Sequence, residues 1–384
     1  AQQPTPPLGG PTPTAAPGPA PFLALPLHTQ LVPPPPGWTD SPLLGVTALA
    51  VHPDYSSTPF LAAGTDIGRI LISKNGGVNW TWSENGLPAD VAITDLVFAP
   101  GELVAVTETG AAYRSRDDGA NWRLLPGLSA GVEQVVFSTA YATDGILFAV
   151  QGGALLRSVD RGDSWAIALS PNGCPLDIAP SPTFGADGVA YASRCDHLAR
   201  STDAGLTWFD LPSGGENLAA GLLMNVRVAP DRILAQGNTQ GMPLFSTDGG
   251  TSWVRAYNPE QAPFTLGSLW SAIEVAADGS YTVAGRASLY DSQQTVWRSQ
   301  DHGKTWYAIA QATRLSGIAI SGTGGIWIGT SDGVFHNVGG GWELSHPGGS
   351  RQELAGEPAQ GVAAVSYTHL RAHETVLDLV CRLL

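Results

Sequence analysis

Short apolar runs recur along the chain in groups of four, and clusters of Gly, Asp, Asn and Ser separate them. The first group comprises the runs 45–53 (GVTALAVHP), 59–65 (PFLAAGT), 68–73 (GRILIS) and 80–83 (WTWS). Runs of this length that are rich in aliphatic and aromatic residues and bounded by turn residues predict β-strands. The first group therefore predicts four consecutive strands.

One motif, S-x-[DN]-x-G-x-x-W, joins the last two runs in six successive groups. Its serines lie at 73, 115, 158, 201, 246 and 299, so successive copies are 42, 43, 43, 45 and 53 residues apart. A repeat of this length with four strands in each unit is typical of a β-propeller blade. A seventh unit keeps the run 325–337 and Trp342 but lacks the motif, as is common in terminal repeats. We predict an all-β chain folded as a β-propeller of about seven four-stranded blades.

The motif has a structural explanation, and we call it the clasp. Its Asp or Asn accepts hydrogen bonds from nearby backbone N–H groups and closes a turn, its Gly adopts a positive φ, and its Trp buries a large ring. Six acidic ligands or catalysts are the alternative, but these acids belong to separate repeats and need not converge. The clasp residues are Ser73, Asn75, Gly77, Trp80, Ser115, Asp117, Gly119, Trp122, Ser158, Asp160, Gly162, Trp165, Ser201, Asp203, Gly205, Trp208, Ser246, Asp248, Gly250, Trp253, Ser299, Asp301, Gly303 and Trp306.

The clasp resembles the Asp-box, also called the BNR repeat, and the resemblance covers about residues 43–345. Asp-boxes occur in sialidases, sortilin-type receptors, xyloglucan-cleaving glycosidases and proteins similar to photosystem II assembly factors. The resemblance implies a propeller in which the motif is a structural hairpin at the blade periphery, away from the ligand face. These families differ in chemistry, so the motif implies no single activity.

The charge of the chain excludes two classes of partner. The formal net charge is −14, and Lys74 and Lys304 are the only lysines. Nucleic acids and anionic membrane surfaces both require basic patches, so we expect neither as a partner. No run of 18 apolar residues is present, and we therefore expect no transmembrane segment. We expect a monomer.

Composition divides the chain into three segments. Residues 1–38 are rich in Pro, Thr, Ala and Gly and predict an extended linker or stalk, with a disordered tail as the alternative. Residues 39–365 hold the propeller. Residues 366–384 contain no Gly or Pro and resemble a translated adapter read-through, although a genuine amphipathic helix is the alternative. On the read-through interpretation, the natural chain continues past about Val365. Two alternatives are then open: seven blades close the ring, or the propeller is truncated at its C-terminal end and further blades follow.

Two cysteines lie at facing ends of a predicted hairpin. Cys174 precedes one strand and Cys195 follows the next, with a turn near 181–188 between them. This arrangement permits a disulfide between Cys174 and Cys195, with two buried thiols as the alternative. A disulfide requires an oxidising compartment, and a Thr/Pro-rich stalk before an acidic domain with few lysines also fits export. We expect an extracellular, cell-surface or periplasmic protein.

The ligand face of a propeller is built from the loops before each inner strand and between the second and third strands. Polar and aromatic residues in those loops form our candidate binding face, although Asp and Gly are also frequent in turns for backbone reasons alone. The 53-residue step adds sequence around Trp270 and Tyr290, and we expect the partner surface there first. The candidates are Asp66, Glu108, Glu133, Arg194, Asp196, Trp270, Tyr290 and Asp332.

No enzyme class is fully represented in the sequence. A sialidase needs an arginine trio and a Tyr nucleophile, and its usual F/Y-R-I-P signature is absent; we expect the arginines before the clasp serines to pair structurally. The segment 64–68 (GTDIG) is similar to one that carries a catalytic Asp in xyloglucan-cleaving glycosidases, but the second carboxylate comes from a second propeller in that family. Metal-site spacings are absent. We therefore expect no catalytic, cofactor or metal residues.

These observations favour an exported, non-enzymatic propeller that serves as a binding or scaffold module for a protein or a glycan. Because this function follows from the fold alone, it remains an association. A fragment of a glycoside hydrolase, of the xyloglucanase or sialidase type, is the first alternative. An assembly factor for a membrane complex is the second.

Overall fold

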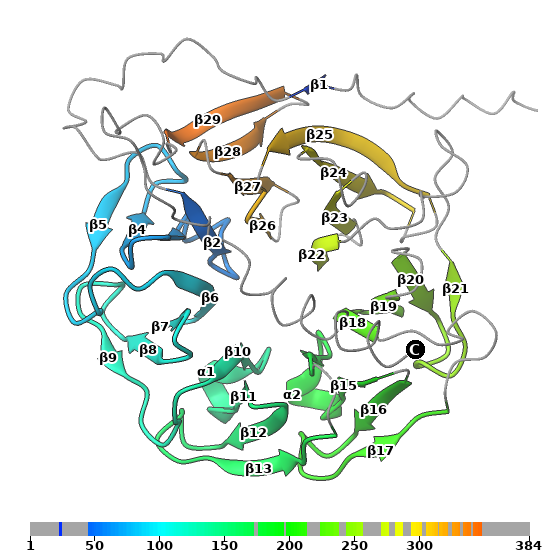
Figure 1. Cartoon of the computed structure of the whole chain (residues 1–384). Coiled ribbons are helices and arrows are strands. Elements are labelled where there is room, and N and C mark those ends of the chain that lie inside the picture. The colour runs from blue at the N-terminus through cyan, green and yellow to red at the C-terminus, as the bar shows by residue number, and fades with distance from the viewer. Residues whose placement is uncertain are drawn as a thin grey trace, which may run out of the picture.

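The computed structural model describes residues 23–24, 45–172, 176–195, 197–212, 223–237, 243–255, 270–275, 281–286, 293–301, 305–313, 315–321, 325–330, 333–338 and 341–347. Within these ranges, seven sheets stand in a ring (Figure 1). Each contains four consecutive antiparallel strands, and one of them carries β1 (Leu23–Ala24) as a fifth strand. The predicted β-propeller of about seven four-stranded blades is therefore confirmed.

The first four blades also contain the two short helices. Blade 1 comprises β2 (Val46–Val51), β3 (Leu61–Thr65), β4 (Ile70–Ser73) and β5 (Thr81–Ser83), and blade 2 comprises β6 (Ile93–Ala99), β7 (Glu102–Thr107), β8 (Ala112–Ser115) and β9 (Arg123–Leu124). Blade 3 comprises β10 (Val132–Phe137), α1 (Tyr141–Asp144), β11 (Leu147–Gln151), β12 (Ala154–Ser158) and β13 (Ala166–Leu169), and blade 4 comprises β14 (Ile178–Pro180), α2 (Phe184–Asp187), β15 (Ala190–Arg194), β16 (His197–Ser201) and β17 (Phe209–Asp210).

The last three blades follow the same order. Blade 5 comprises β18 (Leu223–Ala229), β19 (Arg232–Gly237), β20 (Pro243–Ser246) and β21 (Val254–Arg255), and blade 6 comprises β22 (Trp270–Val275), β23 (Tyr281–Arg286), β24 (Gln293–Ser299) and β25 (Tyr307–Thr313). Blade 7 comprises β26 (Gly317–Ile320), β27 (Ile326–Thr330), β28 (Gly333–Val338) and β29 (Gly341–Pro347).

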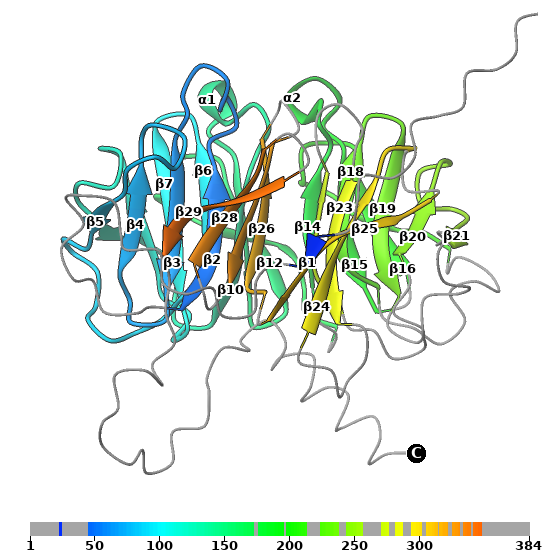
Figure 2. The same cartoon turned by 90° about the horizontal axis from the view of Figure 1, so that it is seen from above.

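Each blade runs from an inner strand at the axis to an outer strand at the rim, so its connections alternate between two faces of the ring. The clasp face carries the connections after the first and third strands, which include α1 and α2 (Figure 2). The turn face carries the connections after the second strand and those that lead into the next inner strand. The clasps and the loops of the predicted binding face therefore lie at opposite ends of the blades.

Each clasp is closed by hydrogen bonds between its own residues. In blade 4, Ser201 Oγ donates to Asp203 Oδ1 at 2.9 Å and accepts from the N–H of Gly205 at 2.9 Å. The N–H of Thr207 donates to Asp203 Oδ1 at 2.9 Å, and the Thr207 hydroxyl donates to Asp203 Oδ2. Two of these bonds are present in all six copies. The serine at motif position 1 donates to the acid or amide at position 3, and the backbone N–H of position 7 donates to the same oxygen.

Clasps also join each blade to the one before it. Gly205 has a φ of 81°, and a Cβ at this position would lie 2.5 Å from Phe148 of blade 3, so only glycine fits. Arg157 of blade 3 donates from Nε to the carbonyl of Ala204 in the same clasp at 2.6 Å. Arg114 of blade 2 donates in the same way to Arg161 O in blade 3 at 2.9 Å. These arginines, which precede clasp serines, therefore connect adjacent blades.

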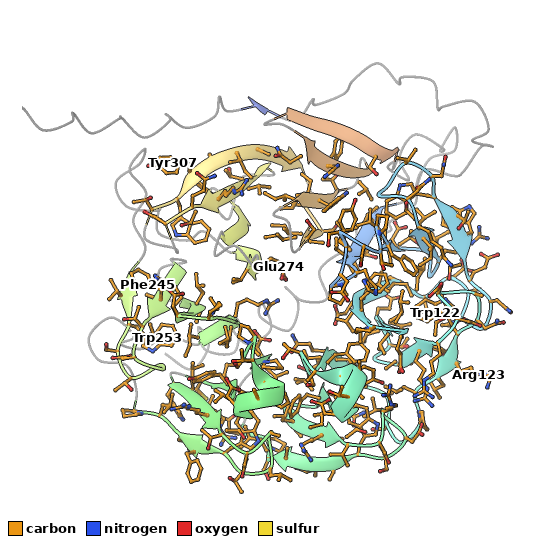
Figure 3. All side chains as sticks on the ribbon, turned by 180° about the vertical axis from the view of Figure 1, so that it is seen from behind. Trp122, Arg123, Phe245, Trp253, Glu274 and Tyr307 are labelled. Carbon is orange, nitrogen blue, oxygen red and sulfur yellow. The ribbon has the colours of Figure 1, made fainter. Side chains whose placement is uncertain are left out.

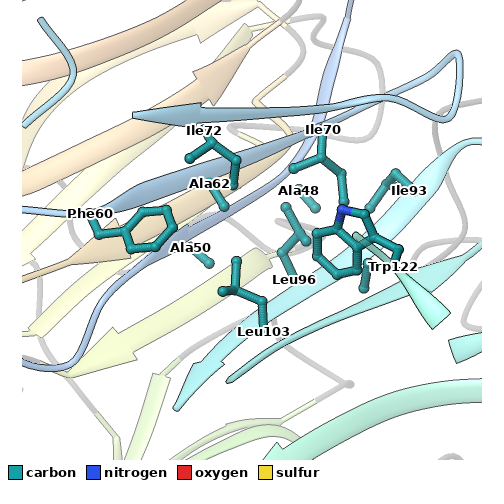
Figure 4. Packing of buried hydrophobic residues seen from close by; sticks show 11 residues of the cluster. Ala48, Ala50, Phe60, Ala62, Ile70, Ile72, Ile93, Leu96, Leu103 and Trp122 are labelled. Atoms are coloured by element: carbon teal, nitrogen blue, oxygen red, sulfur yellow. The ribbon is translucent and has the colours of Figure 1, made fainter. Parts of the chain in front are cut away.

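Apolar side chains fill the space between neighbouring blades. Figure 4 shows the cluster between blades 1 and 2, in which the clasp tryptophan of blade 2 packs against the sheet of blade 1. Trp122 is 3% exposed and Ile93 is fully buried. Because burial of apolar area is the main stabilising term, each blade depends on its neighbours for a core. The labelled members are Ala48, Ala50, Phe60, Ala62, Ile70, Ile72, Ile93, Leu96, Leu103 and Trp122.

The ring closes between blade 7 and blade 1 with the same contact that joins blade 1 to blade 2. Ser83 of β5 donates to the carbonyl of Gly119, and Trp122 Nε1 donates to Ser83 Oγ at 2.8 Å. At the closure, Ser345 of β29 donates to Gly77 O at 2.8 Å, and Trp80 Nε1 donates to Ser345 Oγ at 3.3 Å. Blade 7 lacks a clasp of its own, but its Ser345 contacts the clasp of blade 1 as Ser83 contacts the clasp of blade 2. Seven blades therefore complete the ring.

The described part of the N-terminal segment pairs with the propeller at its rim. Within the predicted linker 1–38, Leu23–Ala24 form β1, which pairs in parallel with β25 at the rim of blade 6. The remainder of that segment and the tail 366–384 lie outside the described residues. The predicted boundaries at 38 and 365 also lie outside them.

The clasp serine can be tested by removing its hydroxyl. Ser201→Ala leaves the buried N–H of Gly205 without its acceptor, and we expect the free energy of unfolding to fall by about 1–3 kcal/mol. Urea unfolding followed by tryptophan fluorescence measures this loss. Ser129→Ala, at an exposed serine before β10, is the control and should change stability by less than about 0.5 kcal/mol. Equal midpoints for both variants would contradict the assigned role.

Acid should weaken the clasps. Bonds from the side chain and backbone of the seventh residue lower the pKa of Asp117, Asp160, Asp203 and Asp248 from 3.8 to about 2. A depressed folded-state pKa contributes stability that is present above about pH 4 and is lost as the pH falls toward 2. We expect the melting temperature to drop over this window, and to drop less when the four acids are replaced by Asn, the residue that the first clasp carries at position 75. An unchanged acid dependence in the fourfold variant would refute this explanation.

Candidate functional site

The inner strands place five polar side chains around the axis of the ring, and we call these residues the axial cluster. They come from five consecutive blades, and Figure 3 shows Glu274 close to the axis, whereas Trp122, Trp253 and Tyr307 lie farther out. Most other residues of the inner strands are apolar, and those that are buried pack between the blades. The axial cluster comprises Asp95, Gln134, Asp177, Arg227 and Glu274.

Asp177, directly before β14, is the most highly connected member of the cluster. Its Oδ1 accepts hydrogen bonds from Gln134 Nε2 at 3.0 Å and from the N–H of Ile178 at 2.9 Å. Its Oδ2 accepts from the N–H of Val226 at 2.6 Å and lies 3.6 Å from Arg227 Nη1. These are three hydrogen bonds and one ion-pair contact, and together they fix the orientation of the Asp177 carboxylate.

Arg227 of blade 5 forms ion pairs with carboxylates of both neighbouring blades. Besides Asp177 of blade 4, it contacts Glu274 of blade 6, with 3.1 Å between Nη2 and Oε1. Burial lowers the pKa of the Arg227 guanidinium, but Glu274, Asp177 and Asp95 together outweigh burial and raise it. Arg227 therefore stays charged and links the inner strands of three blades at the axis.

Irregularities in the strands help to orient the side chains at the turn-face end of the axis. In β2, β6, β10 and β22 one extra residue interrupts the pairing with the second strand near the start of the inner strand. Such bulges bend a strand and redirect its side chains. In β6 the residue after the bulge is Asp95, and in β10 it is Gln134. The extra residues are Thr47, Thr94, Glu133 and Ser271.

Gln134 keeps an unused hydrogen-bonding group in the cluster. Its Nε2 donates to Asp177, but its Oε1 is buried and accepts no hydrogen bond. A buried acceptor without a donor is costly, and native proteins usually satisfy such an atom with water or a ligand. The axial cluster therefore offers an acceptor for an N–H or O–H group.

Three of the predicted candidates lie on the turn face but bond to backbone groups beside them. Asp66 contacts the turn through its main chain, whose N–H donates to Gly45 O at 3.1 Å, while its Oδ1 is buried and accepts no hydrogen bond from the described residues. Glu108 accepts the N–H of Ala92 at Oε1 at 3.4 Å. Glu133 is exposed, and its Oε1 accepts the N–H of Gly153 at 3.3 Å. These contacts belong to the turns, in agreement with the turn-chemistry alternative.

Arg194 points toward the outer strand of its blade. Its Nη1 donates to Ser170 O of blade 3 at 3.0 Å, and its Nε lies 3.8 Å from Asp210 of β17. His197 Nε2 lies 3.6 Å from the same carboxylate oxygen. Cys195, between these residues, is disulfide-bonded. Cys174 lies outside the described residues, so its pairing with Cys195 stays a prediction.

Several other candidates cannot be placed. Asp196, Tyr290 and Asp332 lie outside the described residues, as does the clasp residue Gly303. Trp270 begins β22, but its side chain is outside them.

Sequence reasoning missed the axial cluster because it used the inner strands only as evidence for the fold. The available signal was the presence of one or two charged or amide residues inside each apolar run: ITDLVFA, VEQVVF, LDIAP, NVRVA and AIEVA. The seventh clasp position was a second missed signal. It is always a hydrogen-bonding residue: Asn79, Asn121, Ser164, Thr207, Ser252 and Thr305.

Comparison with solved structures supports the fold. YCF48 bound to D1 peptide aligns with a TM-score of 0.54 at 16% identity, over 76% of this chain and 93% of that one. The WD40 β-propeller domain of Doa1 aligns with a TM-score of 0.55 at 11% identity, over 76% and 91%. The GH74 enzyme of Niastella koreensis aligns with a TM-score of 0.45 at 15% identity, over 79% and 66%. The first two alignments show that the chain is similar in fold to β-propellers.

No family model matches the sequence, and no curated protein matches it. Among the described residues, no group of three or more His, Cys, Asp or Glu could hold a metal ion. The helices in the described part of the chain are too short to cross a membrane.

Removing the central cation should destabilise the ring. Arg227→Met leaves Asp177 and Glu274 without their shared partner, and partial exposure of the cluster should hold the loss to about 2 kcal/mol. Urea unfolding measures the loss, and adding Glu274→Gln should recover part of it. Lys74→Met, which breaks an exposed pair with Asp118, should cost less than about 1 kcal/mol. An Arg227→Met variant as stable as the unmodified protein would show that the cluster does not hold the blades together.

Proposed function

We propose that this chain is an exported, non-enzymatic β-propeller that binds a positively charged segment of a partner protein at the axial cluster. The observation that carries the proposal is the excess of acceptors over donors at the axis. Among the residues that the structure describes at the axis, Asp95, Asp177 and Glu274 face one cation, Arg227, and Gln134 Oε1 lacks a donor. Lysine and arginine side chains, and N–H groups of a peptide, supply the missing charge and donors.

The charge of the whole chain favours the same class of partner. A net charge of −14 attracts cationic segments over a distance and disfavours anionic ones. A peptide also presents regularly spaced N–H groups, which suit carboxylate and amide acceptors better than hydroxyl groups alone. We therefore favour a protein partner over a glycan.

The contacts of Asp177 and Glu274 argue against hydrolysis as the function. A glycoside hydrolase needs one carboxyl group to exchange a proton and a second to attack or to activate water. Asp177 accepts hydrogen bonds from Gln134 Nε2 and from the N–H groups of Ile178 and Val226, and it forms an ion pair with Arg227. Glu274 is paired with the same arginine. Either carboxylate would have to give up a contact with Arg227 to take part in that chemistry.

Family and location follow as parts of the same proposal. The hydrogen bonds of the clasp agree with membership of the Asp-box propellers. The disulfide at Cys195 and the two lysines in 384 residues favour an exported protein. One structural neighbour is YCF48 bound to D1 peptide, so a propeller of similar fold accommodates a peptide.

Fluorescence polarisation with labelled ten-residue peptides tests the proposal. Lysine-rich and arginine-rich peptides should bind, a glutamate-rich peptide should not, and binding should weaken as salt rises from 50 to about 300 mM. Asp95→Asn should weaken binding about threefold to tenfold, which corresponds to about 1 kcal/mol. Asp163→Asn removes the same charge at the rim of blade 3 and should leave affinity unchanged.

Three results would contradict the proposal. Equal binding of acidic and basic peptides would show that the axial charge is not used. Binding to neutral glycans on an array, with no peptide binding, would favour the carbohydrate alternative. Turnover of an aryl glycoside that Glu274→Gln abolishes would favour the hydrolase alternative.

A further inference from the structure

The outer strand of blade 6 differs from the outer strands of the five blades before it. β5, β9, β13, β17 and β21 contain two to four residues each, whereas β25 contains seven. An outer strand presents a row of backbone N–H and C=O groups that have no partner within the sheet. A short outer strand has few such groups. The row of N–H and C=O groups along β25 is therefore the longest among the outer strands of blades 1 to 6.

The sequence of β25 lacks the usual protection of an edge strand. It is YAIAQAT and contains no charged residue and no proline, whereas charges and prolines at an edge prevent pairing with other chains. β29 of blade 7 is equally long but contains Glu343 and ends at Pro347. One extra residue, Ile309, interrupts the pairing of β25 with β24, and Ala310–Thr313 then pair without interruption.

A strand of this chain already lies on that uninterrupted stretch. Leu23 pairs with Ala310 and Ala24 with Gln311, in parallel (Figure 1). Both residues belong to the sequence Pro21-Phe22-Leu23-Ala24-Leu25-Pro26, an apolar run between two prolines within a Pro-rich segment. Proline has no N–H and cannot donate to a strand ladder, so the prolines limit this strand to the four residues between them.

We propose that the edge formed by Ala310–Thr313 is a docking site for a short, uncharged, proline-bounded strand of a partner protein, and that β1 is a displaceable ligand of the same site. This mode of recognition is β-strand addition: backbone hydrogen bonds supply affinity, and small pockets for alternate side chains supply selectivity. The site lies at the rim and does not depend on the axial cluster.

Weak pairing makes β1 suitable for exchange. Only two residue pairs join it to β25, and each net hydrogen bond contributes about 1 kcal/mol. β1 belongs to the same chain as β25, so its pairing is intramolecular and is favoured over that of an identical separate strand. A partner strand that makes four pairs instead of two displaces it. Until then β1 covers the edge against non-specific pairing.

Hydrogen exchange on the full chain tests the site. Leu23→Pro combined with Ala24→Pro removes the donors of β1, and amides in 307–313 should then exchange about fivefold to tenfold faster. Amides of β29 (Gly341–Pro347) should not change, and Ala15→Pro combined with Ala16→Pro in the same segment is the matched control. The melting temperature should stay constant in both variants, because β1 lies outside the ring.

A peptide supplied separately tests the partner chemistry. The synthetic peptide 20–27 (APFLALPL), added to the Leu23→Pro, Ala24→Pro variant, should restore protection of 307–313, and the same peptide with Leu23→Asp should not. Unchanged exchange in the variant, or no protection by the unmodified peptide, would overturn the proposal. A concentration-dependent dimer of the unmodified protein that the variant loses would also overturn it, since β1 would then come from a second copy.

Discussion

The contact between each clasp and the blade before it is the constraint on which the whole ring depends. The clasp glycine lies against the preceding blade, as Gly205 does against Phe148, so this position admits no side chain. A buried serine hydroxyl accepts a hydrogen bond from the glycine N–H and donates one to the aspartate or asparagine. The motif thus shapes its own hairpin and couples neighbouring blades. Blade 7 needs no clasp because Ser345 receives the clasp of blade 1.

A ring built in this way leaves its axis available for other chemistry. Packing between blades uses the flanks of each sheet, and the clasps occupy the opposite face from the turns. Inner-strand side chains that point to the axis are therefore not needed for the apolar core. Asp177, Arg227 and Glu274 link three blades there, and Asp95 and Gln134 extend the cluster toward two more. The charge and the unused acceptor at this place are the basis for the proposed partner.

The fold was predictable from the sequence because its determinants repeat. The spacing of Ser73 and its counterparts gives the blade length, and the runs around them match β2 to β5 within three residues. The site was not predictable in the same way, because Asp95, Gln134, Asp177, Arg227 and Glu274 come together only through closure of the ring. Turn residues such as Glu108 suggested a binding face, but their contacts satisfy the turns themselves. Pairing of Leu23–Ala24 with β25 also joins distant segments without any repeated motif.

A crystal structure of the protein with a bound lysine-rich peptide tests the central claim most directly. The account predicts that the peptide lies at the axis on the turn face, with a donor group within hydrogen-bond distance of Gln134 Oε1 and a cationic group close to Asp95. A peptide bound on the clasp face or at the rim, with the axial cluster unaltered, would contradict it.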